Sequence, residues 1–161
     1  MLTVEQVMSR PVVTVSMDAS LSQVRDLFER EHFHHVIVVD DDGRAVGVIS
    51  DRDLLKRLSP FVGSKLNERR QDENTLKLKA HQAMTRNPLS VTPTDAVQSA
   101  VDLILGHSFR SLPVLDRDGR PAGVISWKDV LRWGSIEGVW QGPDEEPNLF
   151  NLADDDAKRA A

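Results

Sequence analysis

The chain has 161 residues, of which 40% are hydrophobic and 28% are charged, as is usual for a globular protein with a buried core. Its formal net charge of −5 argues against nucleic acid or an anionic membrane as the main partner, because both attract a basic surface. The absence of cysteine excludes disulfides, thiolate metal sites and a cysteine nucleophile, and it fits the reducing cytoplasm.

The N-terminal sequence MLTVEQVMSR has no basic stretch followed by an apolar one, so we predict no secretory signal. The longest apolar runs, such as VIVV at 36–39, are too short to cross a bilayer. We therefore expect a soluble, cytoplasmic protein that does not bind membranes.

Residues 1–58 predict alternating strands and helices. The β-branched run VVTV at 12–15 predicts a strand, and Ser20 is a suitable N-cap for the following stretch, whose apolar residues recur at helical spacing. HVIVVD at 35–40 predicts a buried strand, and the Asp-Gly turn after it leads to a return strand, AVGVIS at 45–50. Ser50 is then expected to cap a short leucine-containing helix.

The same order of elements is predicted a second time, in residues 83–134. Residues 59–82 between the two stretches predict a loop and a connecting helix, which we place in DENTLKLKAHQAM. The second set comprises a strand at 89–91, a helix at about 95–106 after Thr94, strands at 111–116 and 121–126, and a helix from 127. Residues 135–161 are acidic and are expected to form a mobile tail.

The two sets are copies of each other. Residues 7–55 align with residues 83–131 without a gap at a shift of 76, so that GVISDRDLL falls on GVISWKDVL. About a third of the aligned positions are identical, which indicates a tandem duplication. Two copies are too few for a solenoid, so we expect the pair to close about a pseudo-twofold axis around a shared cleft.

Each copy has a Ser-x-x-Asp sequence at the start of its last helix. The pairs are Ser50 with Asp53 and Ser126 with Asp129. One interpretation is a capping box, in which the serine and the acid satisfy the backbone at the helix start. The other is a ligand site: the hydroxyl and the helix amides suit phosphate, and the carboxylate suits the two ribose hydroxyls. Arg52 and Lys128 would add a cation suited to phosphate.

The sequences HHVIVVDDDGRAVGVISDRDLL and RSLPVLDRDGRPAGVISWKDVL, with MSRPVVTV and MTRNPLSV before them, resemble two CBS (cystathionine-β-synthase) domains. The chain is thus similar to a stand-alone CBS pair, or Bateman module, from residue 1 to about 133. The resemblance implies an α/β (α+β) fold of tandem β-α-β-β-α repeats packed through their sheets about a pseudo-twofold axis. It also implies two clefts for adenine nucleotides and a homodimer formed through helices.

The resemblance assigns roles to residues in both copies. Ser50 and Ser126 would contact phosphate, and Asp53 and Asp129 would hold ribose. The other residues implied to line the clefts are Val13, His34, His35, Val36 and Ile49 in the first copy and Leu89, Arg110, Ser111, Leu112 and Ile125 in the second. The two isoleucines would pack against the base.

The copies differ beside the Ser-x-x-Asp turns. The first has Ile37 where the second has the proline usual in the family, Pro113. Asp51 adds a negative charge at the first turn, where the second has Trp127, and two such anions repel by roughly 1 kcal/mol even in water. We therefore expect the second turn to be the stronger phosphate site. Trp127 could also be a hydrophobic plug or a dimer contact.

The sequence HFHH at 32–35 admits three interpretations: a metal site, a cleft lining by His34 and His35, or a solvated helix end. We expect no metal ligands, because no acidic residue in the stretch or cysteine completes a set. If His35 faces phosphate, ligand affinity should fall as pH rises through the histidine range.

No nucleophile elbow, HExxH sequence or Walker loop is present, so we expect no catalytic residues and no enzyme activity. The predicted function is a regulatory module that senses AMP, ADP, ATP or a related adenosyl compound such as S-adenosylmethionine, and signals by conformational change to a partner protein. No tightly bound cofactor is expected, although ATP could bring Mg²⁺. The alternative is a structural or dimerisation adaptor with unoccupied clefts.

Overall fold

The computed structural model describes residues 1–32, 34–58 and 70–136. The chain divides into a unit of residues Met1–Val130, which contains both copies up to the start of the last helix, and a unit of residues Leu131–Ala161. Most of the expected inter-copy loop and nearly all of the expected acidic tail lie outside the described residues. Within the described ranges, no helix combines the length and the apolar character needed to span a bilayer.

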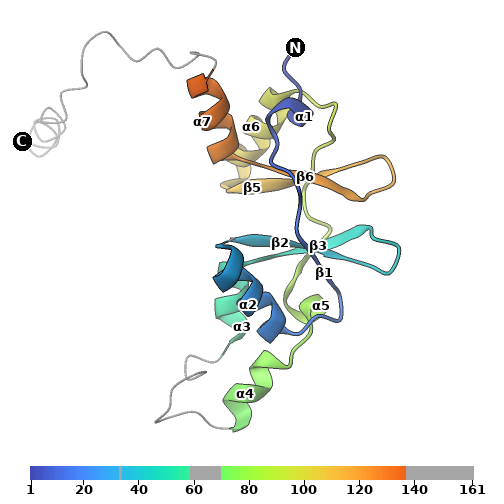
Figure 1. Cartoon of the computed structure of the whole chain (residues 1–161), viewed down its shortest axis with the longest axis vertical. Helices are drawn as coiled ribbons and strands as arrows, with labels where there is room; N and C mark the ends of the chain where they lie inside the picture. The colour runs from blue at the N-terminus through green and yellow to red at the C-terminus, as the bar shows by residue number, and fades with distance from the viewer. Residues whose placement is uncertain (33, 59–69, 137–161) are drawn as a thin grey trace, which may run out of the picture. The chain divides into compact units, whose positions relative to one another are not determined.

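The first copy follows the predicted order of elements. It consists of β1 (Thr14–Ser16), α2 (Leu21–Glu31), β2 (His35–Val39), β3 (Ala45–Ser50) and α3 (Asp51–Arg57). Strand β2 pairs in parallel with β1 and antiparallel with β3, and α2 and α3 lie along one face of this sheet (Figure 1). Ser20 caps α2 as predicted, with its hydroxyl oxygen accepting the Gln23 N–H at 3.2 Å.

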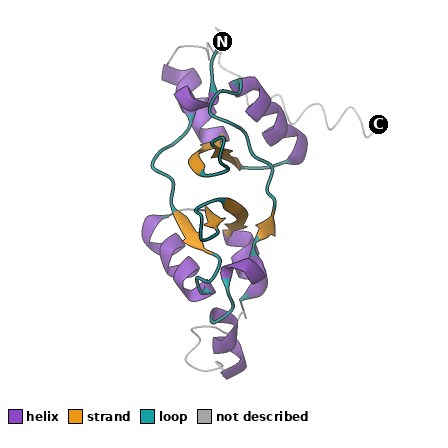
Figure 2. Cartoon of the chain, turned by 90° about the vertical axis from the view of Figure 1, so that its right-hand side faces the viewer, coloured by secondary structure: helices purple, strands orange, loops and turns teal. Residues whose placement is uncertain are grey.

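The second copy repeats this layout with one strand fewer. It consists of α6 (Val97–His107), β5 (Ser111–Leu115), β6 (Pro121–Ser126) and α7 (Trp127–Ile136). Figure 2 shows the strands of each copy as a layer beside its helices. The mixed α/β fold predicted from the sequence is therefore confirmed.

The strand predicted at 89–91 is wrong, because only Val91 pairs with β5. Val91 donates its N–H to the Pro113 carbonyl at 3.1 Å and accepts the Leu115 N–H at 2.9 Å. Extending this parallel ladder would require an N–H at position 113, and proline has none. Pro113, which stands where the first copy has Ile37, thus reduces the predicted strand at 89–91 to a single bridge at Val91.

Two helix predictions also need correction. Helix α6 begins at Val97 rather than directly after Thr94, because the Asp95 carboxylate accepts the Thr92 N–H at 2.7 Å and closes a turn there. The connecting helix is two short helices, α4 (Arg70–Leu76) and α5 (Ala80–Ala83). Between them Lys79 forms a β-bridge with Ser20, and the Leu78 carbonyl accepts the N–H of Leu21 at 2.8 Å, so pairing with the first copy interrupts the helix.

The segments that precede the two copies are exchanged between them. Helix α1 (Val4–Val7) contacts α6 and β6, and Ser9 forms a β-bridge with Val124. In the same way α5 contacts α3 and β3, and β4 (Thr85–Arg86) pairs with β3. The segment before the first copy therefore packs on the second copy, and the segment before the second copy packs on the first.

The exchange depends on two glycines at equivalent positions. A Cβ atom at Gly123 would lie 2.6 Å from Met8 Sδ, and a Cβ at Gly47 would overlap Met84 Sδ. Both methionines are buried. A residue without a side chain is needed at each of these strand positions to let the methionine of the exchanged segment lie against the sheet.

Candidate functional site

The first Ser-x-x-Asp turn forms a corner between β3 and α3. The Ser50 hydroxyl oxygen accepts the Asp53 N–H at 3.1 Å, and Asp53 Oδ2 accepts the Ser50 N–H at 2.9 Å and the Ser50 hydroxyl at 2.7 Å. This is the reciprocal capping box that the sequence admits. Asp53 Oδ1 has no hydrogen-bond partner in the part of the chain that the structure describes.

The second corner, between β6 and α7, has the same local hydrogen bonds. Asp129 Oδ2 accepts the Ser126 N–H at 2.8 Å and the Ser126 hydroxyl at 2.5 Å, and the Ser126 oxygen accepts the Asp129 N–H at 3.4 Å. Here the other carboxylate oxygen is also occupied, since Asp129 Oδ1 accepts the Ser9 hydroxyl at 2.6 Å. Asp129 is only 8% exposed, so its carboxylate is buried, and both of its oxygens accept hydrogen bonds.

Equivalent residues flank the two corners. In the strand pairing, His35 lies opposite Ser50, and Ser111 lies opposite Ser126. The backbone also repeats: the Asp51 N–H donates to the His34 carbonyl at 3.0 Å, as the Trp127 N–H does to the Arg110 carbonyl at 3.4 Å. The predicted lining segments around residues 34 and 110 therefore lie beside their own corners.

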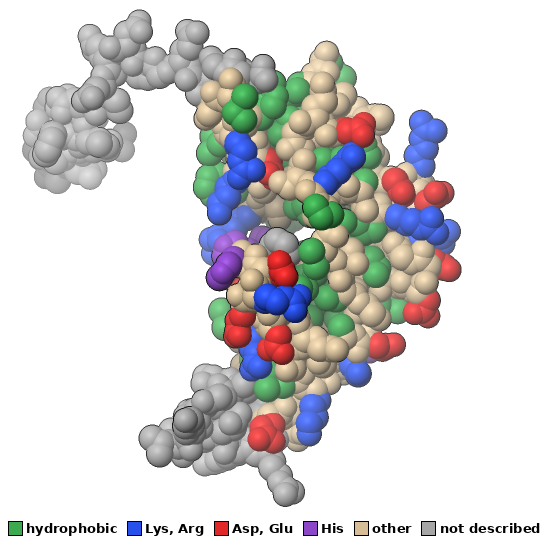
Figure 3. Space-filling view, in the orientation of Figure 1, with side chains coloured by type: hydrophobic (Ala, Val, Ile, Leu, Met, Phe, Trp, Pro, Cys, Tyr) green, Lys and Arg blue, Asp and Glu red, His purple; other side chains and the backbone are tan. Residues whose placement is uncertain are grey.

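The charges near the first corner come from both copies. Burial is the main cause that lowers the pKa of His35, and the neighbouring His34 and Arg110 lower it further, while Asp51 and Asp53 oppose the shift. Arg110 of the second copy is thus close enough to His35 to act on its charge. Figure 3 shows histidine side chains next to basic ones at the edge of a hollow. Because its pKa is lowered, His35 is mainly neutral at pH 7 in the free protein.

Asp51, the extra acid of the first corner, is not isolated. Its Oδ2 lies 3.1 Å from His34 Nδ1, which makes an ion pair when the imidazole is protonated, and its Oδ1 accepts the Arg52 N–H at 2.8 Å. Both side chains of the pair are about half exposed, so the interaction is screened by water. Asp51, on which the expected preference for the second turn was based, therefore has hydrogen-bond partners of its own.

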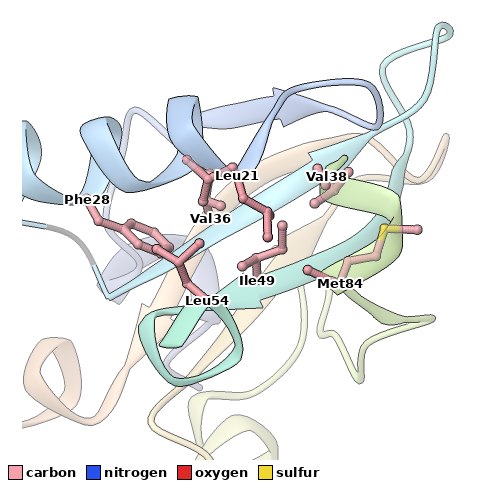
Figure 4. Packing of buried hydrophobic residues seen from close by; sticks show 10 residues of the cluster. Leu21, Phe28, Val36, Val38, Ile49, Leu54 and Met84 are labelled. Carbon is pink, nitrogen blue, oxygen red and sulfur yellow. The ribbon is translucent and has the colours of Figure 1, made fainter. Parts of the chain in front are cut away.

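Four of the predicted lining residues are core residues of their own copies. Ile49 and Ile125 are 0% exposed, and Val36 and Leu112 are equally buried. Figure 4 shows Ile49 among Leu21, Val38 and Met84 in the apolar cluster of the first copy. Their side chains leave no surface for a ligand, so a contact with a base would have to use their backbone.

The remaining predicted residues lie at the surface or at its edge. Arg52 and Lys128 are exposed, and Lys128 Nζ lies 5.8 Å from the centre of the Trp127 ring. Val13 is half-buried and Leu89 is exposed. Within the described ranges, neither the Arg52 nor the Lys128 side chain forms a hydrogen bond to a corner.

The three histidines of the HFHH sequence lie between the end of α2 and the start of β2. His32 ends α2 in the left-handed conformation with a φ of 55°, and Phe33 lies outside the described residues. Among the residues that the structure describes, no three acidic or histidine side chains are placed to hold a metal ion.

Ser9 is the residue of the site that the sequence analysis missed. Its hydroxyl reaches Asp129 across 120 positions of the sequence. The available signal is that both copies carry a hydroxyl residue after their methionine, Ser9 after Met8 and Thr85 after Met84.

Comparison with known proteins gives consistent matches. A family model described as CBS domain matches residues 4–60 and again residues 80–135. A CBS domain-containing protein of Dictyostelium discoideum is 33% identical over 132 residues, which are 80% of this chain and 88% of that protein.

Solved structures of CBS-domain proteins have the same fold as this chain. CBSX2 of Arabidopsis thaliana in complex with AMP superimposes with a TM-score of 0.72 at 27% identity, covering 86% of this chain and 99% of that chain. A CBS domain pair in complex with 5′-methylthioadenosine and S-adenosyl-L-methionine has the same fold, with a TM-score of 0.67 at 20% identity, covering 84% of this chain and 97% of that chain. The resemblance found in the sequence is confirmed.

Proposed function

Since the chain belongs to the CBS domain family and carries the domain twice, we propose that it is a regulatory module that binds an adenine nucleotide or a related adenosyl compound. The observation that carries the proposal is the pair of Ser–Asp corners, placed at equivalent positions in a chain whose structure matches a CBS-pair protein crystallised with AMP. S-adenosylmethionine belongs to the same ligand class and is included in the proposal.

In the proposed complex, the ribose hydroxyls donate to the aspartate of a corner. A carboxylate with a free oxygen is suited to this role, because hydrogen bonds to a charged acceptor are stronger than neutral ones. Phosphate would lie near Ser50, His35 and Arg110, where a hydroxyl, an imidazole and the guanidinium of the other copy come together. The corners then bind without chemistry, and we propose no catalytic step and no resident cofactor; Mg²⁺ would arrive only with ATP.

Signalling requires that the ligand binds one conformation of the protein better than another. Contacts between the copies supply a means, because Ser9 and Arg110 each act on a corner residue of the other copy. We propose that a ligand changes these contacts and that a partner protein reads the change.

The proposed assembly is a cytoplasmic homodimer formed through helices. Leu55 on α3 and Leu105 on α6 are 73% and 74% exposed, so both helices offer an apolar side chain that a second copy could cover. Sedimentation of the purified protein would measure its mass, and a monomer at micromolar concentration would contradict this part of the proposal.

A thermal-unfolding screen with AMP, ADP, ATP and S-adenosylmethionine tests the function. A ligand at one hundred times its dissociation constant should add about 2.7 kcal/mol to the free energy of unfolding, which raises the Tm by about 5–10 °C for a chain of this size. If no compound shifts the transition, the adaptor alternative, in which the clefts stay empty, replaces this proposal.

A further inference from the structure

We propose that the Ser9 hydroxyl decides which corner receives the ligand: it closes the corner at Asp129 and leaves the corner at Asp53 to bind the ribose. This inference rests on the proposed function and makes it specific. It also reverses the expectation, drawn from Asp51, that the second turn is the stronger site.

Ser9 is held in place by its backbone. Its N–H donates to the Val124 carbonyl at 2.8 Å, and its carbonyl accepts the Val124 N–H at 3.2 Å. The preceding Met8 is buried against Gly123. The serine is therefore fixed on the edge of β6, and its hydroxyl lies where it donates to Asp129 Oδ1 at 2.6 Å.

The Asp129 carboxylate has fewer acceptor positions open to a ligand than the Asp53 carboxylate, because both of its oxygens are already hydrogen-bonded. Oδ2 accepts two hydrogen bonds from Ser126, and Oδ1 accepts the hydrogen bond from Ser9. The two hydroxyls of a ribose would have to share Oδ1 with Ser9 or displace it, and the hydrogen bond of Ser9 to this buried anion is of the strong, charge-assisted kind. We expect this competition to weaken binding at the second corner by roughly ten- to a hundredfold.

The first corner lacks this competitor although its backbone is the same. Thr85 stands at the position equivalent to Ser9 and pairs with Val48 in the same register as Ser9 with Val124. Within the described residues, however, Thr85 makes no hydrogen bond to Asp53, and Asp53 Oδ1 remains available. The Asp51 carboxylate beside this corner lies 3.1 Å from His34 Nδ1.

Titration calorimetry of the full chain with AMP tests the inference through the number of sites. The wild-type protein should bind one AMP per chain, and Asp53→Ala should weaken this site at least tenfold. Ser9→Ala should gain a second AMP per chain, and adding Asp129→Ala to Ser9→Ala should remove it. Ser9→Thr, which keeps a hydroxyl, and Thr85→Ala, the matched change in the other segment, should both keep one site.

The outcomes separate the two proposals. Two equal sites in the wild-type protein, or a Ser9→Ala variant that stays at one site or binds AMP more weakly, would overturn the role of Ser9 while leaving nucleotide binding intact. No binding of any adenosyl compound by any variant would overturn the proposed function, and this inference with it. Ser9 is itself exposed, so its replacement is expected to leave the fold intact, and a circular dichroism melt of each variant verifies this.

Discussion

The corner at Ser50 and the corner at Ser126 have the same backbone, and they differ in the side chains that arrive from elsewhere in the chain. Both serines and both aspartates form the same reciprocal hydrogen bonds, and both follow a six-residue strand. Asp129 receives a further hydrogen bond from Ser9, whereas Asp53 receives none from Thr85. These comparisons concern described residues only.

The difference indicates which residues of a duplicated site can change without loss of stability. The hydrogen bonds inside each corner complete a helix start, so losing them would cost stability in either copy. The residues from the exchanged segments and from the opposite copy are under no such constraint. Asymmetry between the corners is therefore found in residues such as Ser9 and Arg110 and in the two positions inside each turn, while the serine and the aspartate remain alike.

The largest expected effect tests whether the cores of the two copies are equivalent. Ile49 and Ile125 are both fully buried at matching strand positions. Each change to alanine should lower the free energy of unfolding by about 2–5 kcal/mol, because it removes buried methyl groups and leaves a cavity. Urea denaturation measures both losses. A loss below 1 kcal/mol in one copy alone would show that the copies do not share the same packing.

The elements that the sequence predicted correctly are those with local causes. The bounds of β3 and β6 agree with the predicted AVGVIS and PAGVIS, and Ser50 caps α3, because alternation, the Asp-Gly turn and the cap act over a few residues. The errors arise from distant partners: Pro113 cannot extend the ladder at Leu89, and Leu78 pairs with Leu21. The closed second corner depends on a contact across the chain, so no local pattern indicated it.

A smaller effect tests the exchanged segments. Gly123→Ala would place a Cβ 2.6 Å from Met8 Sδ and 3.1 Å from the Ser9 carbonyl oxygen, and crowding of this kind costs about 1–3 kcal/mol. Gly47→Ala would overlap Met84, and the three atoms nearest to its Cβ include the Cβ of that methionine at 3.0 Å, so we expect a cost in the same range. Thermal unfolding of the two variants ranks them. Equal stability to the wild type in both would contradict the exchange of segments.

The extra hydrogen bond of the second corner should be measurable as a difference between aspartates. Asp129→Ala should destabilise the protein by about 2–3 kcal/mol and Asp53→Ala by about 1 kcal/mol, because only Asp129 loses a charge-assisted bond to another segment. A double-mutant cycle of Ser9→Ala with Asp129→Ala should give a coupling energy of about 1 kcal/mol. The matched cycle of Thr85→Ala with Asp53→Ala should give a value near zero, and equal couplings would refute the asymmetry.

The smallest expected effect comes from His35, whose counterpart in the second copy, Ser111, does not titrate. Burial lowers the pKa of His35 in the folded protein below its ordinary value of about 6.5. Between the lowered pKa and about 6.5, the unfolded chain binds more protons than the folded one, so stability falls as pH decreases through this range. His35→Gln should therefore lose less stability than the wild type between pH 7.5 and pH 5.5 in urea denaturation. Ser111→Ala should keep the wild-type dependence, and a His35→Gln variant with an unchanged pH profile would show that burial in the first corner does not act on this imidazole.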